Sequence, residues 1–197
     1  VTVTQLPAII YNTFDWGGYL SFFLYPDYQV FWDGRQTTTD MFRQGVEVRH
    51  GNPDWKEVLD NHDINTLIIR TNFIDTGLRY RLIDRLRRNP LWALVFQDDR
   101  SLVFVRRSEV DENWLVQNEI PEKRIDDAIL AHSRHLVGFN RWRYKAWWEI
   151  ARIQLERREY EEAFRSLTEY LSRTPVRDPR AEQYYRLLYP MYGPKES

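Results

Sequence analysis

The chain has 197 residues, a net charge of −1, and 43% hydrophobic and 15% aromatic residues, enough for one packed domain or two small ones. This near-zero charge gives no reason to expect a nucleic-acid partner. The absence of cysteine excludes a disulfide scaffold, a cysteine nucleophile and a thiolate metal site.

The first 35 residues predict a strand, a short helix and a second strand. An apolar run over residues 8–11 ends at Asn12 and is typical of a buried strand. Asp15 is expected to cap a helix that starts near Trp16 and stops at Pro26. The second strand is expected over residues 29–32, followed by an Asp-Gly turn.

Two glycines stand in the first turn of that expected helix. Each weakens a helix by about 1 kcal/mol relative to alanine. Gly17 and Gly18 therefore indicate that a backbone or a ligand approaches the start of the helix closely.

Polar side chains follow both strands, at the end of an α/β sheet where ligands bind. The candidate ligand site comprises Asn12, Asp15, Trp16, Gly17, Gly18, Asp33 and Arg35. Exposed amides at the helix start would suit an anion there. The structural alternative is that Asp15 caps the helix and that Asp33 pairs with Arg35 or caps a turn. Neither nucleotide-binding glycine fingerprint is present.

The motifs N-x-F-D-W-G-G-Y-L, Y-P and V-F-W-D-G-R, within residues 12–35, resemble a known class of protein. They are similar to the start of the soluble C-terminal domain of bacterial GT-C-type glycosyltransferase-like membrane proteins, relatives of the protein mannosyltransferases. The resemblance extends through residues 55–106 and covers roughly half of the chain. It implies an extracytoplasmic domain that follows the last transmembrane helix on the periplasmic face of the inner membrane. In that enzyme type the catalytic acid lies between early transmembrane helices, so the resemblance assigns no catalytic residue here.

No apolar run in the chain approaches the roughly 18 residues that a membrane helix needs. The sequence starts at Val1 without a methionine, and we interpret it as a fragment with a membrane segment upstream.

The pattern through residue 107 continues the α/β alternation. Helices are expected over residues 55–61 and from 77 or 78 to 89. Strands are expected over residues 65–70, 92–96 and 101–106. The fold class is therefore α/β: a small, mostly parallel sheet with flanking helices and a C-terminal antiparallel hairpin, over residues 1–107.

The helix expected before Asn89 carries arginines on its outward face. They are Arg79, Arg81, Arg85, Arg87 and Arg88. They form either a solvated helix face or a contact for anionic lipid headgroups or a lipid-linked phosphate donor.

Residues 108–197 predict a second, all-helical domain. Helices are expected over residues 126–137, 141–158, 160–173 and 178–189, the last one stopped by Pro190 and Gly193. Residues 144–177 resemble one tetratricopeptide repeat of about 34 residues. The matching positions are Trp147, Ile150, Ala151, Ala163 and Pro175, whereas Gln154 and Leu167 depart from the pattern.

Exposed aromatic residues of this tail would suit a protein partner. The candidates are Trp142, Trp147, Trp148, Tyr184 and Tyr185. His132 and His135 have a spacing that can bind a metal, but no third ligand is indicated, so neither a metal nor a cofactor is expected.

We therefore expect a non-catalytic extracytoplasmic domain that binds a glycan or lipid-linked acceptor, covers the membrane active site, or recruits a partner. Its first partner would be its own upstream transmembrane region. The alternatives are a protein-interaction module that uses the helical tail and a standalone α/β enzyme with a site near Asp15, Asp33 and Arg35.

Overall fold

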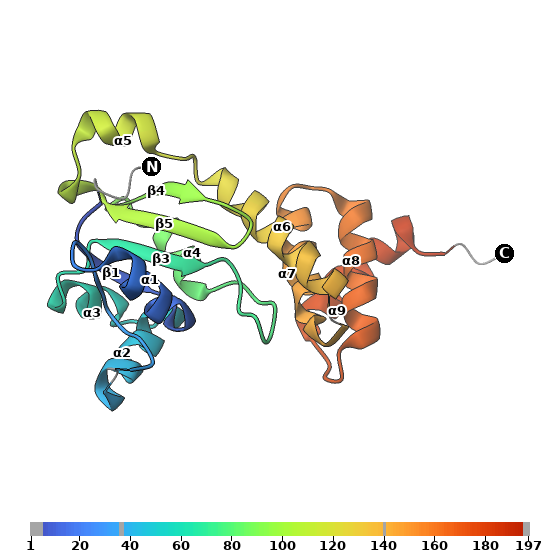
Figure 1. Cartoon of the computed structure of the whole chain (residues 1–197). Helices are drawn as coiled ribbons and strands as arrows, with labels where there is room; N and C mark the ends of the chain where they lie inside the picture. Colours follow the sequence, from blue (N-terminus) through green and yellow to red (C-terminus); the bar gives the residue numbers. More distant parts are fainter. Residues whose placement is uncertain (1–5, 36–37, 140, 195–197) are drawn as a thin grey trace. The chain divides into compact units, whose positions relative to one another are not determined.

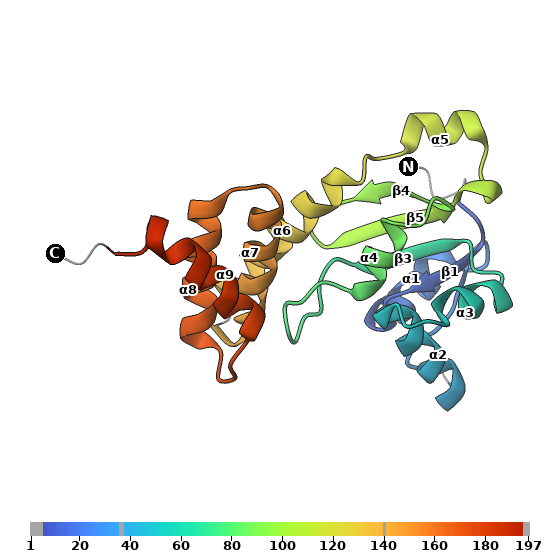
Figure 2. The ribbon, with the colours of Figure 1, turned by 180° about the vertical axis from the view of Figure 1, so that it is seen from behind.

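A computed structural model describes residues 6–35, 38–139 and 141–194 (Figures 1 and 2). Two compact units form the chain. The sheet unit comprises Val1–Thr71 and Tyr80–Ala128, and the helical unit comprises Asn72–Arg79 and Ile129–Ser197. This division differs from one at residue 107 because α5 (Glu112–Asn118) belongs to the sheet unit, while the loop 72–79 belongs to the helical unit.

The sheet unit alternates strands and helices up to a final hairpin. Its elements before the hairpin are β1 (Ile9–Asn12), η2 (Phe14–Trp16), α1 (Gly17–Leu24), β2 (Gln29–Val30), α2 (Thr39–His50), α3 (Trp55–Asn61), β3 (Thr66–Arg70) and α4 (Arg81–Leu86). The hairpin β4 (Trp92–Gln97) and β5 (Ser101–Arg106) is followed by η3 (Arg107–Glu109) and α5. The α/β class and the terminal hairpin are confirmed.

The sheet of the described residues is mixed rather than mostly parallel. Its strand order is β2-β1-β3-β5-β4. β1 runs parallel to both β2 and β3, whereas β5 runs antiparallel to both β3 and β4. The hairpin docks on β3 through its second strand, and this places two antiparallel pairings beside the two parallel ones.

Apolar side chains cover both faces of the sheet. On one face the Tyr11 hydroxyl donates to the Gly45 carbonyl of α2 at 2.7 Å, which fixes β1 against that helix. On the other face Leu115 of α5 packs with Ala93, Val95, Val103 and Val105. Figures 1 and 2 accordingly show α5 beside β4 and away from α2 and α3.

The helix expected from residue 77 or 78 is shorter than predicted, because α4 begins only at Arg81. The residues before it form a loop closed by a bridge between Asn72 and Arg79. Gly77 adopts a φ of 77°, and an added Cβ would lie 2.7 Å from the Cβ of Ala146. The left-handed backbone and the close neighbour both require glycine here, and they interrupt the helix.

The helical unit is built from the C-terminal part of α6 (Lys123–Phe139) and the helices that follow it. These are η4 (Arg141–Arg143), α7 (Lys145–Glu156), α8 (Tyr160–Arg173) and α9 (Pro179–Tyr192). α9 continues past Pro190 to Tyr192 and has Gly193 as its C-cap, so the predicted stop at the proline is wrong and the predicted stop at the glycine is confirmed. Ala151 and Ala163 are fully buried in the core shared by α7, α8 and α9, where their small side chains let the helices approach closely.

A buried polar cluster anchors the loop 72–79 within the helical unit. The Asn72 side-chain amide donates to the Gly77 carbonyl at 2.9 Å and to the Ser133 hydroxyl at 3.1 Å. The Arg79 Nε lies 3.5 Å from a Glu149 carboxylate oxygen, and both side chains are buried. Arg79 is therefore not on a solvated helix face, which corrects the outward placement predicted for it.

Glu149→Ala should destabilise the protein by roughly 3–5 kcal/mol, because it leaves the buried Arg79 guanidinium without its carboxylate. The matched control is Glu161→Ala, which removes an exposed i,i+4 pair with Arg165 and should cost less than about 1 kcal/mol. Urea unfolding followed by helical circular dichroism measures both. Equal losses in the two variants would contradict a structural role for the buried pair.

A second prediction concerns Tyr170, whose hydroxyl donates to the Asp178 carboxylate at 2.9 Å. Burial, followed by the hydrogen bond to Asp178, raises the pKa of Tyr170 from its ordinary value to about 12. As the pH rises, tyrosine ionises in the unfolded chain before Tyr170 ionises in the folded one. The stabilisation of the folded state by the protonated hydroxyl is therefore complete below pH 10 and is lost as the pH rises toward 12, by roughly 2 kcal/mol in total. Tyr170→Phe should reduce the alkaline fall in unfolding free energy, and an unchanged fall would contradict the assignment.

Candidate functional site

The ends of β1 and β2 are locked together by Asn12 and Trp32. The Asn12 side-chain amide donates to the carbonyls of Thr13 and Trp32, both at 3.0 Å. The Trp32 indole N–H donates in return to the Asn12 carbonyl. Because Asn12 is fully buried and its amide nitrogen is committed to these bonds, its N–H groups support the site and do not face a ligand.

The two glycines have different environments. A Cβ on Gly17 would lie 2.2 Å from the Trp32 carbonyl oxygen, whereas a Cβ on Gly18 would meet nothing within 4 Å. Gly17 is therefore required by the close approach of the backbone at the end of β2. The structure gives no steric reason for Gly18, which is exposed at the start of α1.

Asp15 does not cap the helix, which corrects the sequence prediction. It lies inside η2, and its carboxylate accepts from the Arg70 guanidinium, with the Nε at 3.1 Å. The same guanidinium lies over the Trp16 ring, 4.4 Å from its centroid. Arg70, at the end of β3, thus contacts both Asp15 and Trp16. Like Asn12, it stands at the carboxyl end of a strand, where ligands bind in α/β sheets.

Asp33 and Arg35 form the charged pair that the structural alternative predicts. The buried Asp33 carboxylate accepts from the Arg35 backbone N–H and from its Nη2, each at 2.8 Å, and from its Nε at 3.2 Å. This geometry closes the turn after β2 and neutralises the carboxylate. It counts against Asp33 as a free acid or base, although 67% of the Arg35 side chain is exposed.

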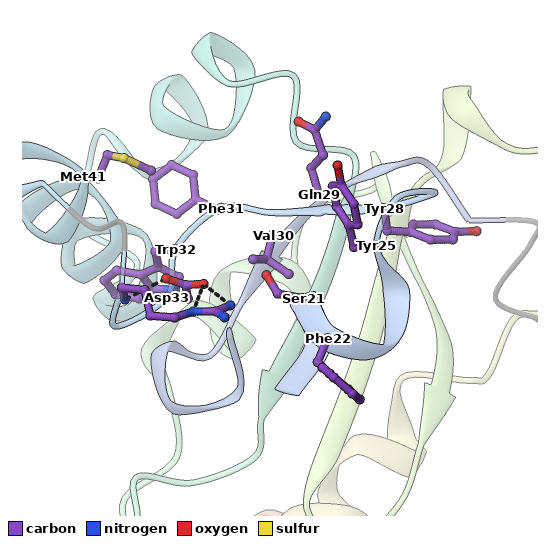
Figure 3. Close-up of a pocket in the computed structure, with 11 residues that line it drawn as sticks. Ser21, Phe22, Tyr25, Tyr28, Gln29, Val30, Phe31, Trp32, Asp33 and Met41 are labelled. Carbon is purple, nitrogen blue, oxygen red and sulfur yellow. Dashed lines mark hydrogen bonds and ion pairs between the residues drawn. The ribbon is translucent and has the colours of Figure 1, made fainter. Parts of the chain in front are cut away.

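A pocket of about 650 Å³ lies beside β2, and both members of this pair line it. The other lining residues are Ser21, Phe22, Tyr25, Tyr28, Gln29, Val30, Phe31, Trp32 and Met41. Figure 3 shows Ser21 and Val30 in the middle of this group, Trp32 and Asp33 toward one end, and Tyr25 and Gln29 toward the other. The pocket therefore combines aromatic rings with hydroxyl, amide and guanidinium groups.

The backbone of β2 adds polar groups to the same pocket. The Gln29 and Phe31 amides donate inward to the carbonyls of Ala8 and Ile10, at 2.9 and 2.8 Å. Because successive residues of a strand alternate their hydrogen-bonding direction, the amide and carbonyl of Val30 point to the outer side. Among the described strands none pairs with that side, so β2 is an edge strand of the sheet.

Sequence reasoning missed the residues that shape the pocket beside the turn. Phe22 lies within the predicted helix, Tyr25 lies at its end, and Gln29 lies in the predicted second strand. Their exposure was the missing information, since nothing in an uncharged helix sequence distinguishes a buried face from a pocket wall.

The predicted partner residues do not form one surface. Trp142 is exposed, whereas Trp147, Trp148 and Tyr185 pack against the core of the helical unit. Tyr184 is exposed in part and lies near Trp148, with their ring centroids 6.4 Å apart.

The two histidines and the other arginines of the predicted helix differ in exposure, and Arg81, Arg85 and Arg88 are exposed as predicted. His132 is buried and His135 is exposed on α6, and no cluster of three metal-binding side chains occurs within the described ranges. Burial and the neighbouring Arg49 lower the pKa of His50. The Arg87 guanidinium pairs with Asp126 at 2.7 Å, so it also differs from a solvated helix face.

No protein-family model, curated protein or solved structure matches the chain. Among the described helices, none has both the length and the apolar character needed to cross a membrane.

Gly17→Ala should destabilise the protein by about 2 kcal/mol or more, because its Cβ would overlap the Trp32 carbonyl and force the end of β2 to move. The matched change Gly18→Ala should be neutral or stabilise by about 0.5–1 kcal/mol, since it improves helix propensity without a clash. Thermal unfolding of the two variants measures the difference. A similar shift in both would contradict the assignment of the first glycine to backbone packing.

Proposed function

We propose that this chain is a non-catalytic, extracytoplasmic binding domain of a GT-C-type glycosyltransferase-like membrane protein. In this proposal the pocket beside β2 holds the sugar part of an acceptor. The resemblance of residues 12–35 supports the parent class and the periplasmic face, and the pocket supports the binding role.

The pocket supplies both kinds of contact that a sugar uses. Aromatic rings such as those of Tyr25 and Phe22 stack on the apolar faces of pyranose rings and bury them. The hydroxyl of Ser21, the amide of Gln29 and the exposed guanidinium of Arg35 can exchange hydrogen bonds with sugar hydroxyls. A volume of about 650 Å³ lies within the usual range for ligand pockets, roughly 300–1,000 Å³.

The charges in the pocket favour binding over catalysis. Enzymes that act on glycosidic bonds generally use two carboxyl groups with separate roles. Among the described residues that line this pocket, Asp33 is the only one with a carboxylate, and it is buried and held by three hydrogen bonds from Arg35. The Asp33 carboxylate would therefore orient the turn and Arg35. The glycosyl transfer of the parent membrane protein would take place outside this domain.

A second candidate function uses the helical unit as a protein-interaction module. α7 and α8 would correspond to the two helices of a tetratricopeptide-like repeat, with Ala151 and Ala163 at its small positions. The outer side of α9 exposes Tyr184, Leu187 and Met191 at the spacing of one helical face, which favours this candidate. Capture of a partner that is lost in Leu187→Ser but retained in pocket variants would select it over sugar binding.

The pocket proposal predicts that an array of soluble oligosaccharides, including mannose-containing ones, detects binding by the wild-type chain. Arg35→Ala should weaken that binding by about tenfold, because a charge-assisted hydrogen bond is lost. Tyr25→Ala should weaken it similarly through loss of ring stacking. Isothermal titration with the best oligosaccharide measures both variants.

The matched control is Arg43→Ala. Arg43 has the same side-chain exposure as Arg35, 68% against 67%, and it also pairs with a nearby aspartate, but it lies outside the pocket. The affinity of Arg43→Ala for the oligosaccharide should equal that of the wild type. Absence of binding to every sugar on the array, with the fold intact, would exclude a glycan as the ligand.

A further inference from the structure

The outer face of α1 is a cluster of exposed aromatic side chains. Tyr19, Phe22 and Phe23 on the helix, with Tyr25 just after it, are between 62% and 79% exposed. The rings of Tyr19 and Phe23 lie 4.6 Å apart, and those of Phe22 and Phe23 lie 5.1 Å apart. We call these four residues the aromatic face. Such a concentration of exposed rings marks an interaction surface.

Charge is absent from the whole segment that carries this face. No acidic or basic residue occurs from Trp16 to Pro26, and Asp27 is the first after it. The two charged pairs on either side in the sequence, Asp15 with Arg70 and Asp33 with Arg35, are each internally neutralised. The aromatic face therefore offers no electrostatic attraction to a charged partner.

We propose that the aromatic face inserts into the interfacial region of a lipid bilayer whose headgroups carry no net charge. Tyrosine and phenylalanine partition to the boundary between headgroups and acyl chains, and an uncharged helix end can enter it without desolvating an ion. Asp27 beside the face disfavours an anionic surface.

The size of the face selects a bilayer over a second protein. Four aromatic side chains that each bury roughly 150–250 Å², at this degree of exposure, present roughly 400–700 Å². A stable protein dimer buries roughly 800 Å² on each partner, so the face is too small to form one alone. Shallow insertion into lipid needs no complementary surface of comparable size.

The lipid-binding test does not depend on the pocket ligand, because Phe23, which carries the label, and Tyr19, which is substituted, do not line the pocket. Since the chain has no cysteine, Phe23→Cys provides a single attachment site for an environment-sensitive fluorophore. The matched control is Val116→Cys on α5, a position that is 78% exposed in the same unit. Both labelled proteins are titrated with phosphatidylcholine vesicles and with vesicles that also contain phosphatidylglycerol.

The expected result is a blue shift and brightening of the label at position 23 with phosphatidylcholine vesicles, without a shift at position 116. Adding phosphatidylglycerol should not tighten binding, and raising the salt concentration should not weaken it. Tyr19→Ser in the labelled Phe23→Cys protein should reduce the apparent affinity by roughly tenfold, the worth of one buried aromatic ring.

Three results would overturn the proposal. The first is an unchanged label at position 23 at millimolar lipid. The second is an equal response at position 116, which would indicate non-specific adsorption. The third is a concentration-dependent dimer in gel filtration that Phe22→Ser abolishes, because a second copy would then cover the face.

Discussion

The burial of Trp32 is the constraint on which the sheet unit depends most. Its ring lies within 5.2–6.0 Å of the rings of Tyr11, Phe14, Phe31 and Phe42. Its indole and its carbonyl both bond to Asn12, and its ring occupies the space that a side chain at position 45 would need. One side chain thus fixes the end of β2 against β1, η2 and α2 together.

This arrangement explains why the pocket forms where it does. β2 is a strand of two residues, and the Asp33 carboxylate closes the turn after it by holding Arg35. α1 must come close to that turn, and Gly17 permits the approach. The outer side of β2 is left between the end of α1 and the charged turn, with its backbone groups facing outward. The pocket is therefore a consequence of how the crossover between β1 and β2 is packed.

The sequence predicted the helices, strands and turns that depend on residues close to one another in the chain. The strongly periodic segment α8 and the continuous apolar run of β5 were located with the correct bounds. The pairing of Asp33 with Arg35 was also accessible, because two residues in one turn are close in any fold. The partner of Asp15 was not, since Arg70 is 55 residues away in the sequence. The helix predicted from residue 77 or 78 was wrong for the same reason. Leu78 continues a helical pattern, but the loop 72–79 is held by a bond from Asn72 to Ser133, 61 residues away.

The pocket and the aromatic face share Phe22 and Tyr25, so the two proposals constrain each other. A ring that both lines a pocket and contacts lipid would place the pocket opening at the membrane surface. A free sugar in solution gains nothing from that position, whereas a sugar carried on a lipid anchor is delivered there by the bilayer itself. An acceptor that satisfied both proposals would therefore be lipid-linked, and we would expect its glycan against Tyr25 and Arg35 and its apolar part in the membrane. Its affinity would exceed that of the matching soluble oligosaccharide, because membrane attachment raises the effective concentration of the sugar at the pocket.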